Sequence, residues 1–335
     1  MSSRAIFPLL LAIGGWVAGC GNNDSGGTSN MCPASIDGVS VSLRVATGTL
    51  CGTLRVPEGA HTVALLVPGS GPTDREGNSA YGVRTDAYAK LAAVLAARGV
   101  ASLRYDKRGI GASASAAASE SDLRPSDGAD DVAGWLAHLK ADDRFEKTIV
   151  VGHSEGSLLA AQAMQRVPAD AFISLAGPGR PMTQVFHDQL ARRLSGEPLA
   201  RADAMLQQLA NGAPVANVPP ALAYSFRPSV QPYLMELLRY QGAVEVAELA
   251  MPTLIAQGTT DVQVTVADAR ALSAARPRAD VLVVDGMCHS LKIASLDEAD
   301  QTAALIDPSR PLAKALVDGI YAFLDKIVAR SIAVK

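Results

Sequence analysis

The sequence predicts an α/β fold in which helices cover both faces of a mostly parallel β-sheet. From about residue 60 onwards, short apolar runs alternate with helical segments of roughly 10–15 residues, which is the pattern of βα units. Apolar residues make up 48% and charged residues 19% of the 335 residues, as in a packed globular protein rather than a disordered one. A strandless stretch from 181 to 252 predicts a helical insertion over one edge of the sheet, not an independent domain.

The N-terminus has the features of an export signal. Arg4 precedes the apolar run 6–17, which is shorter than the roughly 20 residues that a membrane-spanning helix needs. The run ends in Val17-Ala18-Gly19-Cys20, which resembles a bacterial lipobox. We therefore expect residues 1–19 to be a lipoprotein signal peptide and Cys20 to carry the lipid. A generic signal peptide with a chance cysteine is the alternative.

A flexible tether is predicted to follow the anchor. Residues 20–35 are polar and rich in glycine, as in flexible linkers. Gly21 stands where an aspartate often retains such proteins in the inner membrane, so we expect an exported protein anchored to the outer membrane and facing the periplasm.

The other three cysteines differ in their surroundings. Cys32 precedes a predicted hairpin, and Cys51 lies in its second strand. In an oxidising compartment the two cysteines could form a disulfide, although a free buried Cys51 is the alternative. Cys288 has no helix start or base that would activate a thiol, and we interpret it as a buried neighbour of His289.

Strands and helices follow from the spacing of apolar residues and from the Gly and Pro residues that bound the runs. We expect strands at 39–47, 49–56, 61–67, 100–105, 148–151, 171–175, 253–256 and 281–284, and helices at 86–98, 128–140, 157–166 and 317–328. Residues 111–126 are polar and small and predict a loop.

The insertion, at about 181–250, is expected to form a helical cap over the carboxyl edge of the sheet, because proline and glycine break it into short helical segments. It is rich in aromatic side chains that could line an apolar acyl or aryl pocket, although core packing is the alternative for each: Phe186, Tyr224, Phe226, Tyr233 and Tyr240.

Ser154 is the candidate nucleophile. It is the serine of Gly152-His153-Ser154-Glu155-Gly156, a G-x-S-x-G pattern between a predicted strand and a predicted helix. A serine there occupies a sharp turn, and Gly152 and Gly156 remove the Cβ atoms that would collide in it. The helix that follows directs its N-terminal amides toward a developing oxyanion.

A serine needs a base that is held by an acid. Of the five histidines, only His289 follows the last predicted strand. Asp261 follows the strand that ends near Gly258, and it lies between the serine and the histidine in the chain. Asp285 is the rival acid, but it is close to His289 and at a strand end. The sequence therefore predicts Ser154, Asp261 and His289 as a catalytic triad.

The oxyanion hole is expected to use two backbone N–H groups. The glycine-rich turn Pro68-Gly69-Ser70-Gly71-Pro72 follows an early strand and offers the N–H of Ser70, and the N–H of Glu155 is the second donor. An ordinary turn without a catalytic role is the alternative for residues 68–72.

With these motifs the chain resembles the α/β-hydrolase superfamily, and within it bacterial exported esterase-like hydrolases related to the serine aminopeptidase group. The resemblance covers roughly residues 60–328 and rests on the serine pattern, on Gly69 to Arg75, on the order Ser154, Asp261, His289, and on the run Asp106 to Ser113. That run is similar to the D-x-R-G-x-G-x-S loop of proline iminopeptidases, and we assign it a structural role. The family's usual His-Gly before the oxyanion donor is Pro68-Gly69 here. The resemblance implies an α/β-hydrolase domain over residues 36–335.

The expected reaction is hydrolysis of small carboxylic esters through an acyl-enzyme. A serine aminopeptidase or amidase is the first alternative, since the Glu155 side chain could receive a substrate ammonium. A non-catalytic binding lipoprotein on a hydrolase scaffold is the second. No cofactor or metal is expected, because the histidines lack zinc-binding spacing and no phosphate-binding loop is present. A formal charge of −3 gives no basic stripe for nucleic acid. The oligomeric state is left open.

Overall fold

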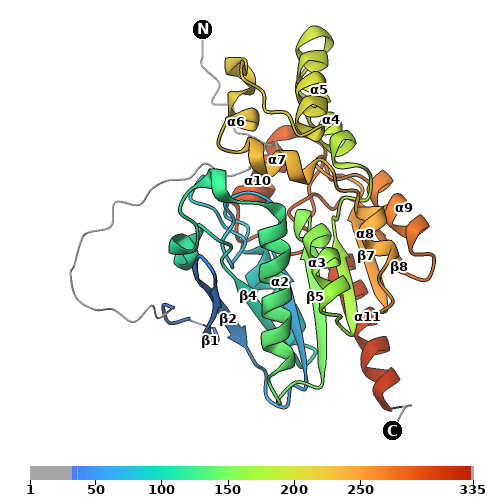
Figure 1. Cartoon of the computed structure of the whole chain (residues 1–335). Coiled ribbons are helices and arrows are strands. Elements are labelled where there is room, and N and C mark those ends of the chain that lie inside the picture. The colour runs from blue at the N-terminus through green and yellow to red at the C-terminus, as the bar shows by residue number, and fades with distance from the viewer. Residues whose placement is uncertain (1–31, 36, 333–335) are drawn as a thin grey trace.

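The structure, a computed structural model, describes residues 32–35 and 37–332 (Figure 1). The predicted signal peptide, the lipid anchor at Cys20 and most of the predicted tether lie outside these residues. Within them, no helix is long and apolar enough to cross a membrane.

One mixed sheet of eight strands organises the fold, in the order β1-β2-β4-β3-β5-β6-β7-β8. β1 pairs with β2 and β2 with β4 in antiparallel fashion, and all other neighbours are parallel. The strands are β1 (Val39–Val45), β2 (Gly48–Arg55), β3 (Thr62–Val67), β4 (Val100–Tyr105), β5 (Lys147–His153), β6 (Ala171–Leu175), β7 (Thr253–Gly258) and β8 (Asp280–Val284).

Helices cover both faces of this sheet because its central strands are apolar on both sides. Val63 and Leu65 of β3 face the core formed with α2, α3, α8 and α9, whereas Ala64 and Leu66 face α1 and α11. These helices are α1 (Ala87–Ala96), α2 (Pro125–Lys140), α3 (Glu155–Arg166), α8 (Gly242–Ala247), α9 (Val266–Ala275) and α11 (Lys314–Ile332). The predicted fold class is therefore confirmed.

Three parts of the described chain differ from the sequence interpretation. The predicted loop at 111–126 contains two short 3₁₀ helices, η1 (Gly111–Ala116) and η2 (Glu120–Asp122), and it ends where α2 begins. Two helices were not predicted, α9 and α10 (Glu298–Ile306). Asp297 caps α10 by accepting from the Ala299 and Asp300 N–H groups. The start of α10 is therefore set by polar capping, and its apolar pattern is too short to predict a helix from the sequence.

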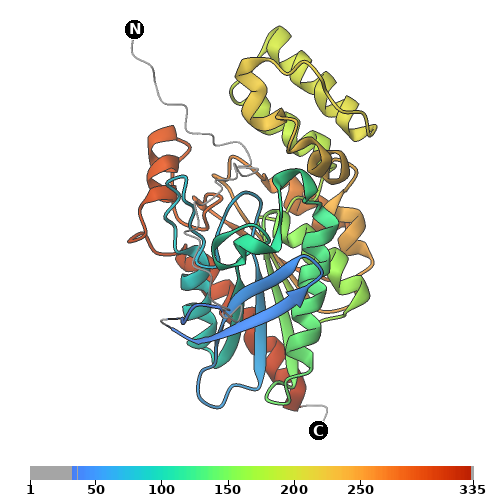
Figure 2. The same cartoon turned by 60° about the vertical axis from the view of Figure 1, so that its left-hand side comes forward.

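The cap lies over the carboxyl ends of the strands, as Figures 1 and 2 show. It consists of α4 (Met182–Ala191), α5 (Gly196–Ala210), η3 (Pro220–Leu222), α6 (Ala223–Phe226) and α7 (Gln231–Leu237). Phe186 and Phe226 are buried in a core of its own, to which α3 contributes only Leu158. The adjacent α8 packs instead against α3 and α9 below, with Val246 in the main core. The cap is therefore shorter at its carboxyl end than the interval 181–250.

A disulfide joins Cys32 to Cys51, with the two Cα atoms 5.4 Å apart. It attaches the start of the described chain to β2, next to the sheet edge. Cys288 is free and buried, as the sequence interpretation expected.

Candidate active site

The strand β5 ends in a tight turn that presents Ser154. Its backbone has φ 55° and ψ −129°, which is strained for a residue with a Cβ, and α3 starts at the next residue. A Cβ on Gly152 would lie 2.5 Å from Ser157 Cα, and one on Gly156 would collide with the carbonyl oxygens of Val67 and Pro68. Both glycines therefore allow the turn, and the serine hydroxyl projects at the carboxyl edge of the sheet.

Ser154, His289 and Asp261 are brought together in one hydrogen-bonded line. His289 Nε2 is 3.0 Å from Ser154 Oγ, and His289 Nδ1 is 2.8 Å from Asp261 Oδ2. All three residues are buried. The carboxylate fixes the imidazole tautomer that leaves Nε2 free to accept the serine proton, so the arrangement suits attack on a carbonyl.

The loop after β7 holds Asp261 in place. Asp261 Oδ1 accepts the backbone N–H groups of Gln263 and Val264 at 2.8 and 3.0 Å, and Oδ2 accepts Gln257 Nε2 at 3.1 Å. The rival acid Asp285 is exposed and accepts from the Thr259 hydroxyl at 3.0 Å. Asp285 is therefore not part of the site.

His153 links three parts of the site. The Gly69 N–H donates to the Tyr88 hydroxyl, which is 2.9 Å from His153 Nδ1. His153 Nε2 donates to the carbonyl oxygen of His289 at 2.9 Å. Since that carbonyl can only accept, Nε2 carries the proton and Nδ1 accepts from Tyr88. Burial, followed by the neighbouring His289, lowers the pKa of His153 to about 3, so its ring is neutral.

The predicted oxyanion donors are available in this structure. Among the residues that it describes, no group accepts a hydrogen bond from the backbone N–H of Ser70 or Glu155. A Cβ on Gly69 would lie 3.0 Å from Ser154 Cβ, so glycine lets the loop 69–72 pass close to Ser154 without crowding it.

Lys107 orients this loop. Its ammonium donates to the carbonyl oxygens of Gly69 and Gly71, both at 2.5 Å. The Gly69 carbonyl and the Ser70 N–H belong to one planar trans peptide and point in opposite directions. By holding the carbonyl, Lys107 therefore fixes the direction of the predicted oxyanion donor. The residue lies within the Asp106 to Ser113 run, but no spacing rule in the sequence marks it.

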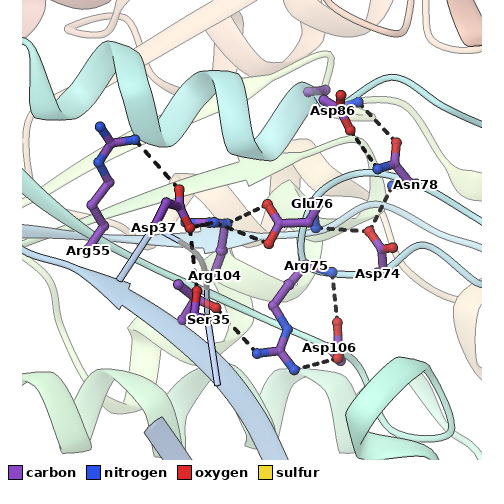
Figure 3. A network of polar contacts seen from close by, with 12 residues as sticks. Ser35, Asp37, Arg55, Asp74, Arg75, Glu76, Asn78, Asp86, Arg104 and Asp106 are labelled. Atoms are coloured by element: carbon purple, nitrogen blue, oxygen red, sulfur yellow. Dashed lines mark hydrogen bonds and ion pairs between the residues drawn. The ribbon is translucent and has the colours of Figure 1, made fainter. Parts of the chain in front are cut away.

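The same run anchors the segment that follows the loop (Figure 3). Asp106 accepts the Arg75 backbone N–H at 2.8 Å and its guanidinium at 2.6 Å. Beside this pair, the buried Arg104 binds Glu76 at 2.9 Å and Asp37 at 2.5 Å. Charged contacts directly after the loop therefore restrict its movement.

Two cavities flank the loop 69–72, and Ser70 lines both. The serine cavity has a volume of about 120 Å³ and is lined by Ser154, His289, Tyr88 and His153. The glutamate cavity has a volume of about 110 Å³ and is lined by Glu155, Lys107, Tyr105 and Tyr233. Of the five cap aromatics that the sequence offered for a pocket, Tyr233 is the one that lines either cavity.

Among the described residues, no group of three or more His, Cys, Asp or Glu side chains could hold a metal ion.

Comparison with known families decides the relationship of this chain. Residues 80–293 match the family described as serine aminopeptidase, S33, and this match spans more than half of the chain. The chain belongs to the serine aminopeptidase S33 family. The matched range of this S33 protein includes Ser154, Asp261 and His289.

A curated relative of this S33 protein is Esterase EstD of Thermotoga maritima, which is 26% identical over 246 residues. The alignment covers 72% of this chain but only 57% of the relative's length.

Solved structures share the fold. Est1E of Butyrivibrio proteoclasticus with bound ferulic acid has a TM-score of 0.58 at 16% identity, covering 86% of this chain and 99% of that one. A malate-bound thermophilic esterase of Thermogutta terrifontis has a TM-score of 0.52 at 17% identity, covering 86% of this chain and 98% of that one. These neighbours establish the α/β-hydrolase fold of the S33 protein.

Proposed function

We propose that this protein is a serine hydrolase that cleaves carboxylic esters through an acyl-enzyme intermediate. The observation that carries the proposal is the line of hydrogen bonds from Ser154 Oγ through His289 to Asp261, at 3.0 and 2.8 Å. Membership of the S33 family and the relative named an esterase support a hydrolase.

In the proposed reaction, Ser154 Oγ attacks the ester carbonyl while His289 Nε2 takes its proton. The carbonyl oxygen becomes an oxyanion that accepts the N–H groups of Ser70 and Glu155. His289 then gives the proton to the leaving alcohol oxygen as the C–O bond breaks. A water molecule, deprotonated by His289, attacks the acyl-serine, and the returning proton frees Ser154 with release of the carboxylic acid.

The tetrahedral intermediate depends on donors that are rigid before substrate binds. Lys107 holds the Ser70 peptide, and Ser154 N–H donates to the Leu175 carbonyl at 2.8 Å, which fixes the elbow. Donors arranged in advance need no reorganisation during reaction, and each is worth about 10²–10³-fold in kcat.

Ester and amide substrates separate the proposal from its alternatives. The purified protein should hydrolyse p-nitrophenyl acetate, butyrate and octanoate, and Ser154→Ala should abolish this turnover. Aminoacyl-nitroanilides test the aminopeptidase activity that the family description also permits. Turnover of nitroanilides above that of esters would replace the proposal with a peptidase, and no turnover of either would favour a non-catalytic binding protein.

We also propose that the protein is an exported lipoprotein anchored through Cys20, at the outer membrane and facing the periplasm. The lipobox-like Val17-Ala18-Gly19-Cys20 supports this placement, and the disulfide between Cys32 and Cys51 suits an oxidising compartment. Cells should incorporate labelled palmitate into the protein in a globomycin-sensitive manner. A Cys20→Ser variant that is still labelled would contradict the anchor.

A further inference from the structure

The glutamate cavity is separate from the cavity that contains the base, and the oxyanion loop lines both. Ser70 lines it, as do Lys107, Glu155 and Tyr233, whereas Ser154 and His289 line the serine cavity. Under the proposed ester hydrolysis, His289 has to protonate the leaving oxygen, so the alcohol part of the substrate occupies the serine cavity. The acyl part then extends past the oxyanion donors, which places it in the glutamate cavity.

The walls of the glutamate cavity suit a carbon chain, but a carboxylate lies among them. Apolar side chains from the core and the cap contribute to the lining: Pro68, Pro72, Ile110, Leu123, Leu159 and Val230. Glu155, the residue next to the nucleophile, lines the same space and is only 2% exposed. A buried carboxylate in such surroundings requires partners for both of its oxygens.

Glu155 has one oxygen paired and one free. Its Oε1 accepts the hydroxyl of Tyr233, which α7 of the cap brings over the start of α3 (Figure 1). Its Oε2 is buried and accepts no hydrogen bond from the part of the chain that the structure describes. Burial raises the pKa of Glu155, and the Tyr233 hydroxyl, the Lys107 ammonium and the nearby Ser70 side chain, which does not reach hydrogen-bond geometry with Oε2, oppose the rise. The mechanism proposed above uses the backbone N–H of this residue but not its carboxylate.

The remaining carboxylates of the cavity already have partners. Glu120 forms an ion pair with Arg227, and Asp131 accepts three hydrogen bonds from Arg108 at 2.7, 2.8 and 3.1 Å. Asp127 accepts the Arg124 backbone N–H at 2.9 Å. Glu155 is therefore the carboxylate of this lining with an oxygen left for a ligand.

The charges around Glu155 decide which donor fits. Lys107, which is half-buried and close enough to interact electrostatically with Glu155, offsets the negative charge of this carboxylate, whereas the guanidinium of Arg108 is paired with Asp131. The Lys107 ammonium would repel a substrate ammonium, and Glu155 would repel a substrate carboxylate. A purely apolar chain would leave Oε2 without a hydrogen bond. A neutral hydroxyl supplies the missing donor without adding charge.

We propose that the glutamate cavity is the acyl subsite and that Glu155, held by Tyr233, recognises a hydroxyl group on the acyl chain. Glu155 is then a specificity-determining residue, and the cap takes part in selection through one tyrosine. The proposal rests on the ester hydrolysis proposed above.

The test compares acyl chains of equal length that differ only at their ends. The probes are the p-nitrophenyl esters of hexanoate, 6-hydroxyhexanoate and 6-aminohexanoate, with the octanoate series as a second length. The discrimination ratio is kcat/KM for the hydroxylated ester divided by kcat/KM for the unsubstituted ester. Because both values come from the same variant, a general change in catalysis cancels in the ratio.

Two variants should lower this ratio. Glu155→Met keeps the backbone N–H and the side-chain length but removes the acceptor, and the ratio should fall about tenfold or more at the chain length that reaches Oε2. Tyr233→Phe should lower it in the same direction and provides a second test if Glu155→Met does not fold. Tyr240→Phe is the matched control, because Tyr240 is a cap tyrosine that donates to Glu236 at 2.9 Å and does not line the cavity. Its ratio should equal that of the wild type.

Failure of this proposal differs from failure of the proposed function. If simple esters are hydrolysed in a Ser154-dependent manner but the ratio stays within about twofold in both variants, hydroxyl recognition by Glu155 is refuted and ester hydrolysis stands. A preference for 6-aminohexanoate that Glu155→Met removes would refute the hydroxyl and identify an ammonium subsite. If no ester is hydrolysed, the proposed function fails first.

Discussion

Replacing Lys107 with methionine should impair catalysis far more than stability. The variant removes the ammonium that binds the Gly69 and Gly71 carbonyl oxygens at 2.5 Å while keeping most of the side-chain volume. The Gly69–Ser70 peptide is then free to rotate, and the Ser70 N–H no longer has a fixed direction. Loss of one oxyanion donor costs about 10²–10³-fold in kcat, so we expect a decrease of about 10²-fold for a misdirected donor.

The effect on folding is smaller because two contributions oppose each other. Burial lowers the pKa of Lys107 from 10.5 to about 8, which corresponds to a penalty of about 3 kcal/mol for the charged form. Two hydrogen bonds to a charged donor contribute about 1.5 kcal/mol each in the other direction. We therefore expect the free energy of unfolding to change by less than about 2 kcal/mol.

The assay measures kcat and KM on p-nitrophenyl butyrate together with urea unfolding. KM should change by less than about threefold, because the ground-state ester makes weaker bonds to the donors than the oxyanion does. Lys140→Met is the matched control, since Lys140 binds the Pro168 carbonyl at 3.0 Å on the surface. A folded Lys107→Met variant whose kcat stays within threefold of the wild type would refute the positioning role.

Three further predictions concern the acid that holds His289, the pH dependence of stability through His153, and the disulfide. Asp261→Asn should reduce kcat by about 10³–10⁴-fold because the His289 tautomer is lost, and steady-state kinetics showing less than a tenfold decrease would contradict the assignment. His153 has a folded pKa near 3, below its ordinary 6.5, so its contribution to stability is complete above pH 6.5 and is lost as the pH falls toward 3. By pH 5 the wild type loses about 2 kcal/mol of its free energy of unfolding through this ring. Urea unfolding of His153→Gln should therefore show a smaller decrease in the free energy of unfolding between pH 7 and 5 than the wild type. Equal decreases in the two proteins would be evidence against a neutral buried ring. Reduction of the bond between Cys32 and Cys51, which are 19 residues apart, should lower the free energy of unfolding by about 3 kcal/mol, whereas an unchanged urea midpoint in dithiothreitol would rule out this contribution.

The sequence was sufficient for the fold and for the residues that local patterns mark. Strands such as β4 and β6 were predicted with their observed bounds, because Gly and Pro residues enclose short apolar runs. Ser154, Asp261 and His289 each follow a predicted strand. Because parallel strands end on the same side of the sheet, the sequence predicted these three distant residues at its carboxyl edge. These predictions depend on periodicity and chain order, which a single sequence contains.

The sequence was insufficient where a role depends on contacts between distant loops. Lys107 binds carbonyl groups more than 35 residues away, and nothing in its neighbourhood distinguishes it from a surface lysine. Tyr233 was one of five cap aromatics, and only its contact with Glu155 separates it from those that fill the cap core. The helix α9 was missed because its start is set by Thr265 and Asp268 in a capping box rather than by a long apolar stripe.

The most direct test of the account is detection of the covalent intermediate on Ser154. The full chain should be incubated with a fluorophosphonate probe, and separately with p-nitrophenyl butyrate under rapid acid quench, and then analysed by intact mass and peptide mapping. The account predicts one phosphonyl or butyryl group per chain on the peptide that contains Ser154, and no adduct in Ser154→Ala. An adduct on another residue, or rapid ester hydrolysis by Ser154→Ala, would contradict it.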